Sequence, residues 1–105
     1  MASRKRYFLD YSSTFKRHLK LVPKKYHSSI RIAIEEQLGH EAEVGTRNRK
    51  PLNKAIAFEA EWELRFGPDN RFRVFYRVQE DVVVLLALGE KKGNRLLIEG
   101  EEVES

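Results

Sequence analysis

The sequence predicts a single α+β domain, in which an N-terminal strand and a pair of helices pack on one face of a twisted, mainly antiparallel sheet of about four strands. Two patterns predict it. Apolar residues recur at helical spacing between residues 15 and 38, whereas from residue 62 onward they alternate with polar residues, as in half-buried strands. At 105 residues, 41% of them hydrophobic, the chain can bury one modest core. Residues 1–5 and 99–105 are expected to be flexible.

The first elements are expected to be a strand and a helix. The run from residue 7 to residue 11 is rich in aromatic side chains, which favour strands. Ser12 or Ser13 then offers a hydroxyl that can cap a helix. That helix is predicted from apolar residues at helical spacing up to Pro23, which cannot continue it: Phe15, Leu19 and Val22.

A second helix is expected to begin near Pro23 or Lys24 and to end at Gly39. Its inward stripe consists of five residues: Tyr26, Ile30, Ala33, Ile34 and Leu38. Because the break between the helices is so short, they should form an αα-hairpin. Residues 39–54 have no sustained period and are rich in Gly, Asn and charge, which predicts a loop that returns to the sheet.

The clearest pattern is a β-hairpin from Trp62 to Val78. Apolar and charged residues alternate on both sides of the turn at residues 67–70. The apolar face, which includes Tyr76, should pack inward, although the sequence leaves open whether the Tyr76 hydroxyl reaches a site. Since residues opposite each other on one face have Cβ atoms only about 5 Å apart, the charged side chains of the other face should lie close together. These are Glu63, Arg65, Arg71, Arg73 and Arg77.

After the hairpin, residues 81–89 form an aliphatic run that is typical of a central strand buried on both faces. The short turn at residues 79–81 favours antiparallel pairing of this strand with the hairpin. Residues 91–95 are expected to form a basic turn, and residues 96–98 a last short strand. The acidic end from Glu99 onward is expected to be frayed.

The charge is distributed unevenly along the chain. Residues 1–54 contain 13 basic and five acidic residues, whereas residues 55–105 contain seven and eleven. The basic half should attract a polyanion such as RNA, DNA or a ribosome, although a merely solvated surface is the alternative. With no cysteine, disulfides and zinc–thiolate sites are excluded. The N-terminus lacks the apolar core of a signal peptide, and no apolar run is long enough for a membrane span, so a soluble cytoplasmic protein is expected.

The arginine-rich face of the hairpin is the best candidate for a site. No phosphate-binding loop is present, and the three histidines are scattered, so neither a metal nor another cofactor is expected. Cross-strand ion pairs with Glu63, each worth at most about 1 kcal/mol, are one explanation of the charged face. The excess of arginine over carboxylate favours binding, because the planar guanidinium fork suits phosphate and unpaired positive charge repels itself.

Four segments carry a family resemblance: Pro51-Leu52, Trp62-Glu63-Leu64-Arg65, Phe72-Arg73-Val74-Phe75-Tyr76, and VLLALGEKKGNRLL from Val84 to Leu97. From Phe8 to about Val103 the chain resembles the RelE/ParE superfamily of toxins from bacterial type II toxin–antitoxin systems. The resemblance implies the same order of a helical hairpin and antiparallel strands. It also implies a small toxin that is neutralised by an antitoxin.

The resemblance implies one of two activities. The RelE branch cleaves mRNA in the ribosome without a metal, by attack of a 2′-hydroxyl on its own phosphodiester, and the ParE branch inhibits DNA gyrase without hydrolysis. In a RelE-like mechanism Arg65 and Arg73 would bind the scissile phosphate, with Lys91 beside them. Glu63 replaces a lysine of the RelE pattern, so it would be either the general base or a salt-bridge residue. Leu97 replaces a tyrosine.

The resemblance also implies partners. A ribonuclease needs the ribosome and mRNA, whereas a gyrase inhibitor needs DNA gyrase. The antitoxin should be acidic, with a helical or extended segment that covers the basic surface. A third alternative is an inactive module that binds only its antitoxin. Nucleic-acid contacts are expected from the first helix and from seven further residues: Arg47, Arg49, Lys50, Lys54, Arg71, Lys92 and Arg95.

Overall fold

The computed structural model describes residues 5–53 and 59–102. The elements follow in the order β1 (Phe8–Tyr11), α1 (Ser13–Lys20), a 3₁₀ turn η1 (Lys24–Tyr26), α2 (His27–Leu38), β2 (Arg49–Pro51), β3 (Trp62–Phe66), a second 3₁₀ turn η2 (Pro68–Asn70), β4 (Phe72–Gln79), β5 (Val82–Lys92), β6 (Arg95–Ile98) and β7 (Glu101–Glu102). The predicted α+β class, with a strand and two helices before the sheet, is confirmed.

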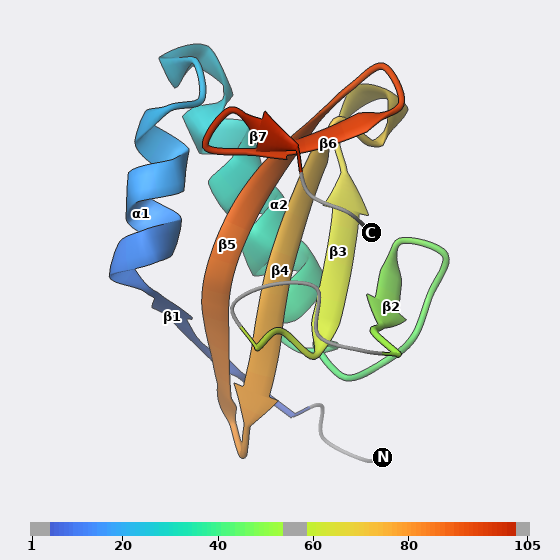
Figure 1. Cartoon of the computed structure of the whole chain (residues 1–105). Helices are drawn as coiled ribbons and strands as arrows, with labels where there is room; N and C mark the ends of the chain where they lie inside the picture. The colour runs from blue at the N-terminus through green and yellow to red at the C-terminus, as the bar shows by residue number, and fades with distance from the viewer. Residues whose placement is uncertain (1–4, 54–58, 103–105) are drawn as a thin grey trace.

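The strands form one sheet, and Figure 1 shows α2 behind the sheet and α1 beside β5. The strand order is β2-β3-β4-β5-β6-β7, and these neighbours are antiparallel. The first part of β5 pairs in parallel with β1, and its last part pairs with β6. β5 therefore has neighbours on both sides, which confirms the prediction of a central strand.

The ends of the helices agree with the prediction in part: α2 begins at His27, later than predicted, because Lys24–Tyr26 form the 3₁₀ turn η1. The Ser12 hydroxyl oxygen accepts a hydrogen bond from the backbone N–H of Phe15 (3.1 Å) and caps α1. α1 ends at Lys20, before the predicted stop at Pro23, but Val22 still packs in the core. α2 ends next to Gly39, as predicted.

The main core lies between the helices and the sheet. It includes side chains that are almost completely buried: Phe15, Ile30, Ile34, Leu38, Leu64, Val74, Tyr76, Val83 and Leu85. A smaller apolar cluster contains Ala60, Phe75, Ala87, Leu96 and Ile98. The register of β4 on β5 shifts between Phe75, which pairs with Ala87, and Tyr76, which pairs with Leu85, so Leu86 is an extra residue at a β-bulge.

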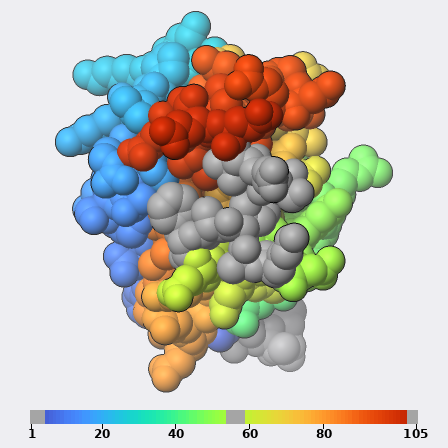
Figure 2. Space-filling view, in the orientation of Figure 1, coloured from blue at the N-terminus to red at the C-terminus, as the bar shows by residue number. Residues whose placement is uncertain are grey.

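Three segments differ from the sequence prediction. The expected loop at residues 39–54 contains β2, a strand too short to show a period. The expected frayed end contains β7, which pairs with β6, and Figure 2 shows the two strands (orange to red) beside the blue α1. The basic turn is shorter than predicted, because Lys92 ends β5 and Arg95 begins β6. No helix in the described residues is long and apolar enough to cross a bilayer.

Candidate functional site

The face of the sheet opposite the helices brings three of the predicted site residues together. Arg65 on β3 and Arg73 on β4 are directly opposite each other in the register. Glu63 lies two residues before Arg65 and therefore projects from the same face. Their apolar neighbours Leu64 and Val74 point the other way, into the main core. Strict alternation in both strands thus puts the two guanidinium groups side by side.

One buried carboxylate holds both guanidinium groups. Arg65 Nε donates to Glu63 Oε1 (2.7 Å), and Arg73 Nη1 lies 3.6 Å from Glu63 Oε2. The Glu63 side chain is only 4% exposed, compared with 10% for Arg73 and 35% for Arg65. The three side chains therefore carry one net positive charge, and Arg65 is their most accessible member. Burial lowers the pKa of the Arg73 guanidinium, and the neighbouring Glu63 opposes that shift.

Arg73 also has one hydrogen-bond donor that is not paired. Its Nε is buried and has no hydrogen-bond partner among the residues that the structure describes, and the same holds for Arg77 Nε on the same strand. Arg77 Nη1 lies 3.6 Å from Glu59 Oε2. A buried donor without an acceptor costs about 1–3 kcal/mol, so an anionic oxygen that reached Arg73 would recover that cost.

Lys91 belongs to the same face. It lies two residues beyond Gly89, which is the β5 partner of Arg73. A Cβ at Gly89 would come within 2.9 Å of the Leu96 side chain, so only glycine lets β6 approach β5 this closely. Lys92 and Arg95 are exposed at the following turn, and Arg95 Nε lies 3.5 Å from Glu102 Oε2.

Arg71 does not share this face, contrary to the prediction. Its Nε donates to Glu90 Oε2 (2.7 Å), its Nη1 donates to the Tyr26 hydroxyl (3.0 Å), and its guanidinium carbon lies 4.6 Å from the centre of the Tyr26 ring. Tyr26 belongs to the helical layer. The reason is the turn: Arg71 closes η2 with helical backbone angles (φ −59°, ψ −35°), so it lies outside the alternation of β4, which begins at Phe72.

Arg49 is not available to a nucleic acid, which also corrects the prediction. Its side chain faces inward, and the residue is 3% exposed. Its guanidinium donates to the carbonyl oxygen of Val44 (2.9 Å) and to both the carbonyl oxygen and Oε1 of Gln37 (2.8 and 2.6 Å). Arg49 thus ties β2 to the end of α2. Arg47 and Lys50 are exposed, and Lys54 lies outside the described residues.

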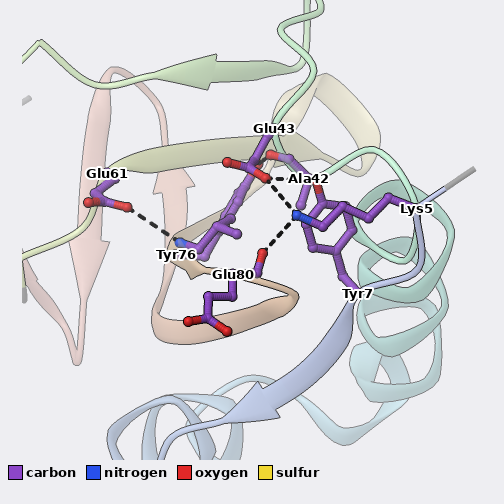
Figure 3. Close-up of polar contacts among 8 residues, drawn as sticks. Lys5, Tyr7, Ala42, Glu43, Glu61, Tyr76 and Glu80 are labelled. Carbon is purple, nitrogen blue, oxygen red and sulfur yellow. Dashed lines mark hydrogen bonds and ion pairs between the residues drawn. The ribbon is translucent and has the colours of Figure 1, made fainter.

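Tyr76 is a core residue, as its alternation predicts. It is completely buried, and its hydroxyl donates to the carbonyl oxygen of Ala42 (2.7 Å). Burial raises the pKa of this hydroxyl. Figure 3 shows the same region, where the Tyr7 hydroxyl donates to Glu43 Oε1 (2.8 Å) and Lys5 donates to the carbonyl oxygen of Glu80 (2.9 Å). These contacts hold the loop after α2 against the sheet.

Sequence reasoning missed the role of His18. β1 and β6 leave part of the edge of β5 without a strand, and there His18 Nδ1 accepts a hydrogen bond from the backbone N–H of Leu88 (3.1 Å). His18 Nε2 lies 3.8 Å from Glu99 Oε1, which also pairs with Arg17. No sequence signal links His18 to a strand 70 residues away. No three His, Asp or Glu side chains in the described residues are grouped as metal ligands would be.

Comparison with known proteins identifies the fold. No protein-family model matches the sequence, and no curated protein matches it. Among solved structures, a chain of the RelBE2 toxin–antitoxin complex from Mycobacterium tuberculosis superposes on 87% of this chain and 98% of its own length, with a TM-score of 0.65 and 19% identity. The chain has a RelE-like fold. At this identity the likeness concerns the RelE-like architecture, which agrees with the family resemblance found in the sequence.

Proposed function

We propose that this RelE-like protein is the toxin of a type II toxin–antitoxin system and cleaves mRNA on the ribosome. The observation that carries the proposal is the pair formed by Arg65 and Arg73, which lie directly opposite each other on the face that the helices leave uncovered. The likeness to a chain of a toxin–antitoxin complex supports it. The exposed Arg47 and Lys50, together with the basic face of α1, would hold ribosomal RNA.

The proposed chemistry depends on positioning and charge. The 2′-oxygen of a nucleotide forms a bond to the adjacent phosphorus while the bond to the 5′-oxygen breaks, which leaves a cyclic phosphate and a 5′-hydroxyl. Arg65, Arg73 and Lys91 would stabilise the negative charge that develops on the phosphate. Of the two roles considered for Glu63, the contacts favour that of an ion-pair partner, since both of its oxygens face guanidinium groups. As a general base it would first have to release Arg65.

Non-enzymatic inhibition of DNA gyrase is the second candidate. Glu63 neutralises one of the two arginines, and no histidine lies among the contacts of this cluster in the described residues. Such a face can bind an anionic surface without having a group that moves protons. A supercoiling assay with the purified protein tests this candidate directly.

The antitoxin would dock on the helical pair. A cavity of about 370 Å³ lies between α1 and α2, with an apolar floor that includes Phe15, Leu19 and Ile34 and with Lys16 and Arg31 at its edge. α1 carries three basic residues in its last turn and no acidic residue in its first. An amphipathic segment with acidic residues would complement both features. The similar RelBE2 chain belongs to a toxin–antitoxin complex, which supports a protein ligand for this chain.

Induced expression with mapping of message ends tests the proposal. Expression of the wild-type chain should arrest growth and cut translated messages, whereas Arg73→Gln should leave both growth and messages intact. Arg6→Gln changes an exposed arginine away from the cluster and should behave as wild type. Growth arrest with intact messages would exclude the nuclease and leave the gyrase inhibitor. Normal growth of cells that express the wild type would identify an inactive module.

A further inference from the structure

A cavity lies between the turn that joins β3 to β4 and the turn that joins β5 to β6. Its volume is about 430 Å³, which is within the usual range of small-ligand sites. Its lining includes Asp69, Arg71, Glu90, Lys91 and Lys92. The backbone N–H of Lys91 donates to the carbonyl oxygen of Arg71 (2.7 Å), and Lys91 is the residue that the cavity has in common with the candidate site.

Arg71 is fixed in this wall and its polar edge is already in use. Nε and Nη2 both contact Glu90 Oε2, and Nη1 donates to the Tyr26 hydroxyl. Glu90 therefore neutralises the guanidinium, and little of its hydrogen-bonding fork is left for a phosphate. The guanidinium carbon lies 4.6 Å from the centre of the Tyr26 ring and 5.6 Å from the centre of the Phe72 ring. The side chain is still 34% exposed, so a ligand in the cavity can contact Arg71, whose planar guanidinium is suited to stacking.

The two lysines give the cavity its charge. Lys92 is exposed and Lys91 is partly exposed, while Glu90 is engaged by Arg71, so Asp69 is the lining carboxylate that remains against two ammonium groups. Lysine is a mobile point charge that follows a phosphate without fixing its orientation. A planar cation beside two mobile cations is the combination that binds a nucleotide in a single strand, where the base stacks and the phosphate is attracted.

We propose that this cavity holds one unpaired nucleotide of a single strand, with the base stacked on Arg71 and the adjoining phosphate attracted by Lys91 and Lys92. The inference rests on the proposed nucleic-acid function and adds to it a place for a nucleotide next to the reacting one. It also changes the predicted role of Arg71 from a phosphate ligand to a stacking surface. In an RNase the strand is mRNA, and in a gyrase inhibitor it is DNA.

Fluorescence of a short RNA that contains 2-aminopurine tests the stacking. The probe is titrated with the full chain at several salt concentrations, and a DNA of the same sequence is run in parallel to identify the strand. Wild type should quench the fluorescent base. Arg71→Lys keeps the charge beside Glu90 and removes the plane, so it should lose the quench and bind about tenfold more weakly, with an unchanged salt dependence.

Lys92→Gln should change the salt dependence of binding and not the fluorescence quenching. It should keep the quench and lower the slope of log affinity against log salt by about 0.7, because one phosphate contact is lost. Arg6→Lys repeats the Arg71 exchange at an exposed position outside the cavity and should change neither property. Thermal unfolding checks that each variant is folded. If Arg71→Lys fails to fold, Lys92→Gln still decides, because its side chain is exposed.

Several results would overturn the inference: no oligonucleotide binding by wild type, full quenching by Arg71→Lys, or an unchanged salt slope in Lys92→Gln. Binding is measured without ribosomes, so the inference and the proposed activity can fail separately. A chain that stacks the probe through Arg71 but leaves messages intact keeps the cavity and loses the nuclease. If wild type cuts messages and Arg71→Lys binds the probe as wild type does, the nuclease proposal stands and the proposed role of the cavity is wrong.

Discussion

The two faces of the sheet differ in how completely their buried polar side chains are hydrogen-bonded. On the helix-covered side, Arg49 is 3% exposed and its guanidinium makes three hydrogen bonds, while Tyr76 is completely buried and its hydroxyl has an acceptor. On the uncovered side, Arg65 and Arg73 share the single carboxylate of Glu63, and Arg73 Nε has no acceptor in the described residues. The helix-covered side is not fully paired either, because the buried Tyr11 hydroxyl has no partner in the described residues, but both Arg49 and Tyr76 are paired as buried groups in a stable core usually are.

The difference separates residues that hold the fold from residues that are available for binding. Fully paired arginine side chains have little left to offer a ligand, as Arg49 and the edge of Arg71 illustrate. Under-paired cations on a rigid strand retain both charge and a donor at a fixed place. Four tests can break or sharpen this contrast.

Leu64→Ala should give the largest effect. Leu64 is completely buried in the main core between α2 and the sheet, so its truncation should lower the free energy of unfolding by about 4 kcal/mol. Leu96→Ala makes the same exchange in the smaller cluster, where the residue is 6% exposed, and should cost about half as much. Urea unfolding measures both. Equal losses would show that the uncovered face carries as much of the core as the covered one.

Glu63→Gln should give the second largest loss of stability, because it removes the only charge that balances Arg65 and Arg73 in the contacts described. Removing one partner of a buried ion pair lowers the free energy of unfolding by about 3 kcal/mol, and here the cost arises from guanidinium groups whose charge is no longer compensated. Inorganic phosphate should then raise the melting temperature of the variant more than that of wild type. A variant as stable as wild type, with no response to phosphate, would contradict the role of Glu63 as an ion-pair partner.

Arg49→Gln and Arg73→Gln make the same change on opposite faces. Arg49→Gln should lower the free energy of unfolding by about 2 kcal/mol, since the carbonyl groups of Val44 and Gln37 lose their donor. Arg73→Gln should cost less than about 1 kcal/mol, because Glu63 keeps Arg65 as its partner. Under the proposed function only Arg73→Gln removes toxicity. Denaturation curves and growth of expressing cells measure the two effects, and the opposite ranking of stability would refute the contrast.

The two faces also differ in how much of their structure could be predicted from the sequence. Alternation in β3 and β4 is strict, so the pairing of Leu64 with Val74 inside and of Arg65 with Arg73 outside was predictable from sequence. The bulge at Leu86 was not, because a run of aliphatic residues has no polar position to mark a change of side.

The missed site features have physical reasons. Arg49 lies in a segment rich in Gly, Asn and charge that resembles an exposed loop, and only its pairing with Leu64 in the sheet turns it inward. Arg71 closes the turn η2 with helical backbone angles, where period two does not apply. The contact of Arg71 with Tyr26 spans 45 residues and depends on how α2 is laid on the sheet, which no local pattern encodes.

Substitution of His18, which lies at the junction of α1 and β5, should give the smallest effect. Burial lowers the pKa of its imidazole, an effect that Glu99 opposes and Arg17 reinforces, so the folded state favours the neutral ring. The neutral Nδ1 accepts from the Leu88 N–H, and a protonated ring cannot. Since the folded pKa lies below the unfolded one, the stabilisation is complete above the unfolded pKa of about 6.5 and is lost as the pH falls through the folded pKa.

Unfolding free energies measured from about pH 7 down to about pH 5 should therefore fall for wild type and fall less for His18→Gln, which has no titrating ring. His40→Gln removes an exposed imidazole and should keep the wild-type slope. A wild-type slope in His18→Gln would mean that His18 is not the buried acceptor for β5. A flat profile in wild type would contradict the lowered pKa of the His18 imidazole and with it the need for a neutral ring at this contact.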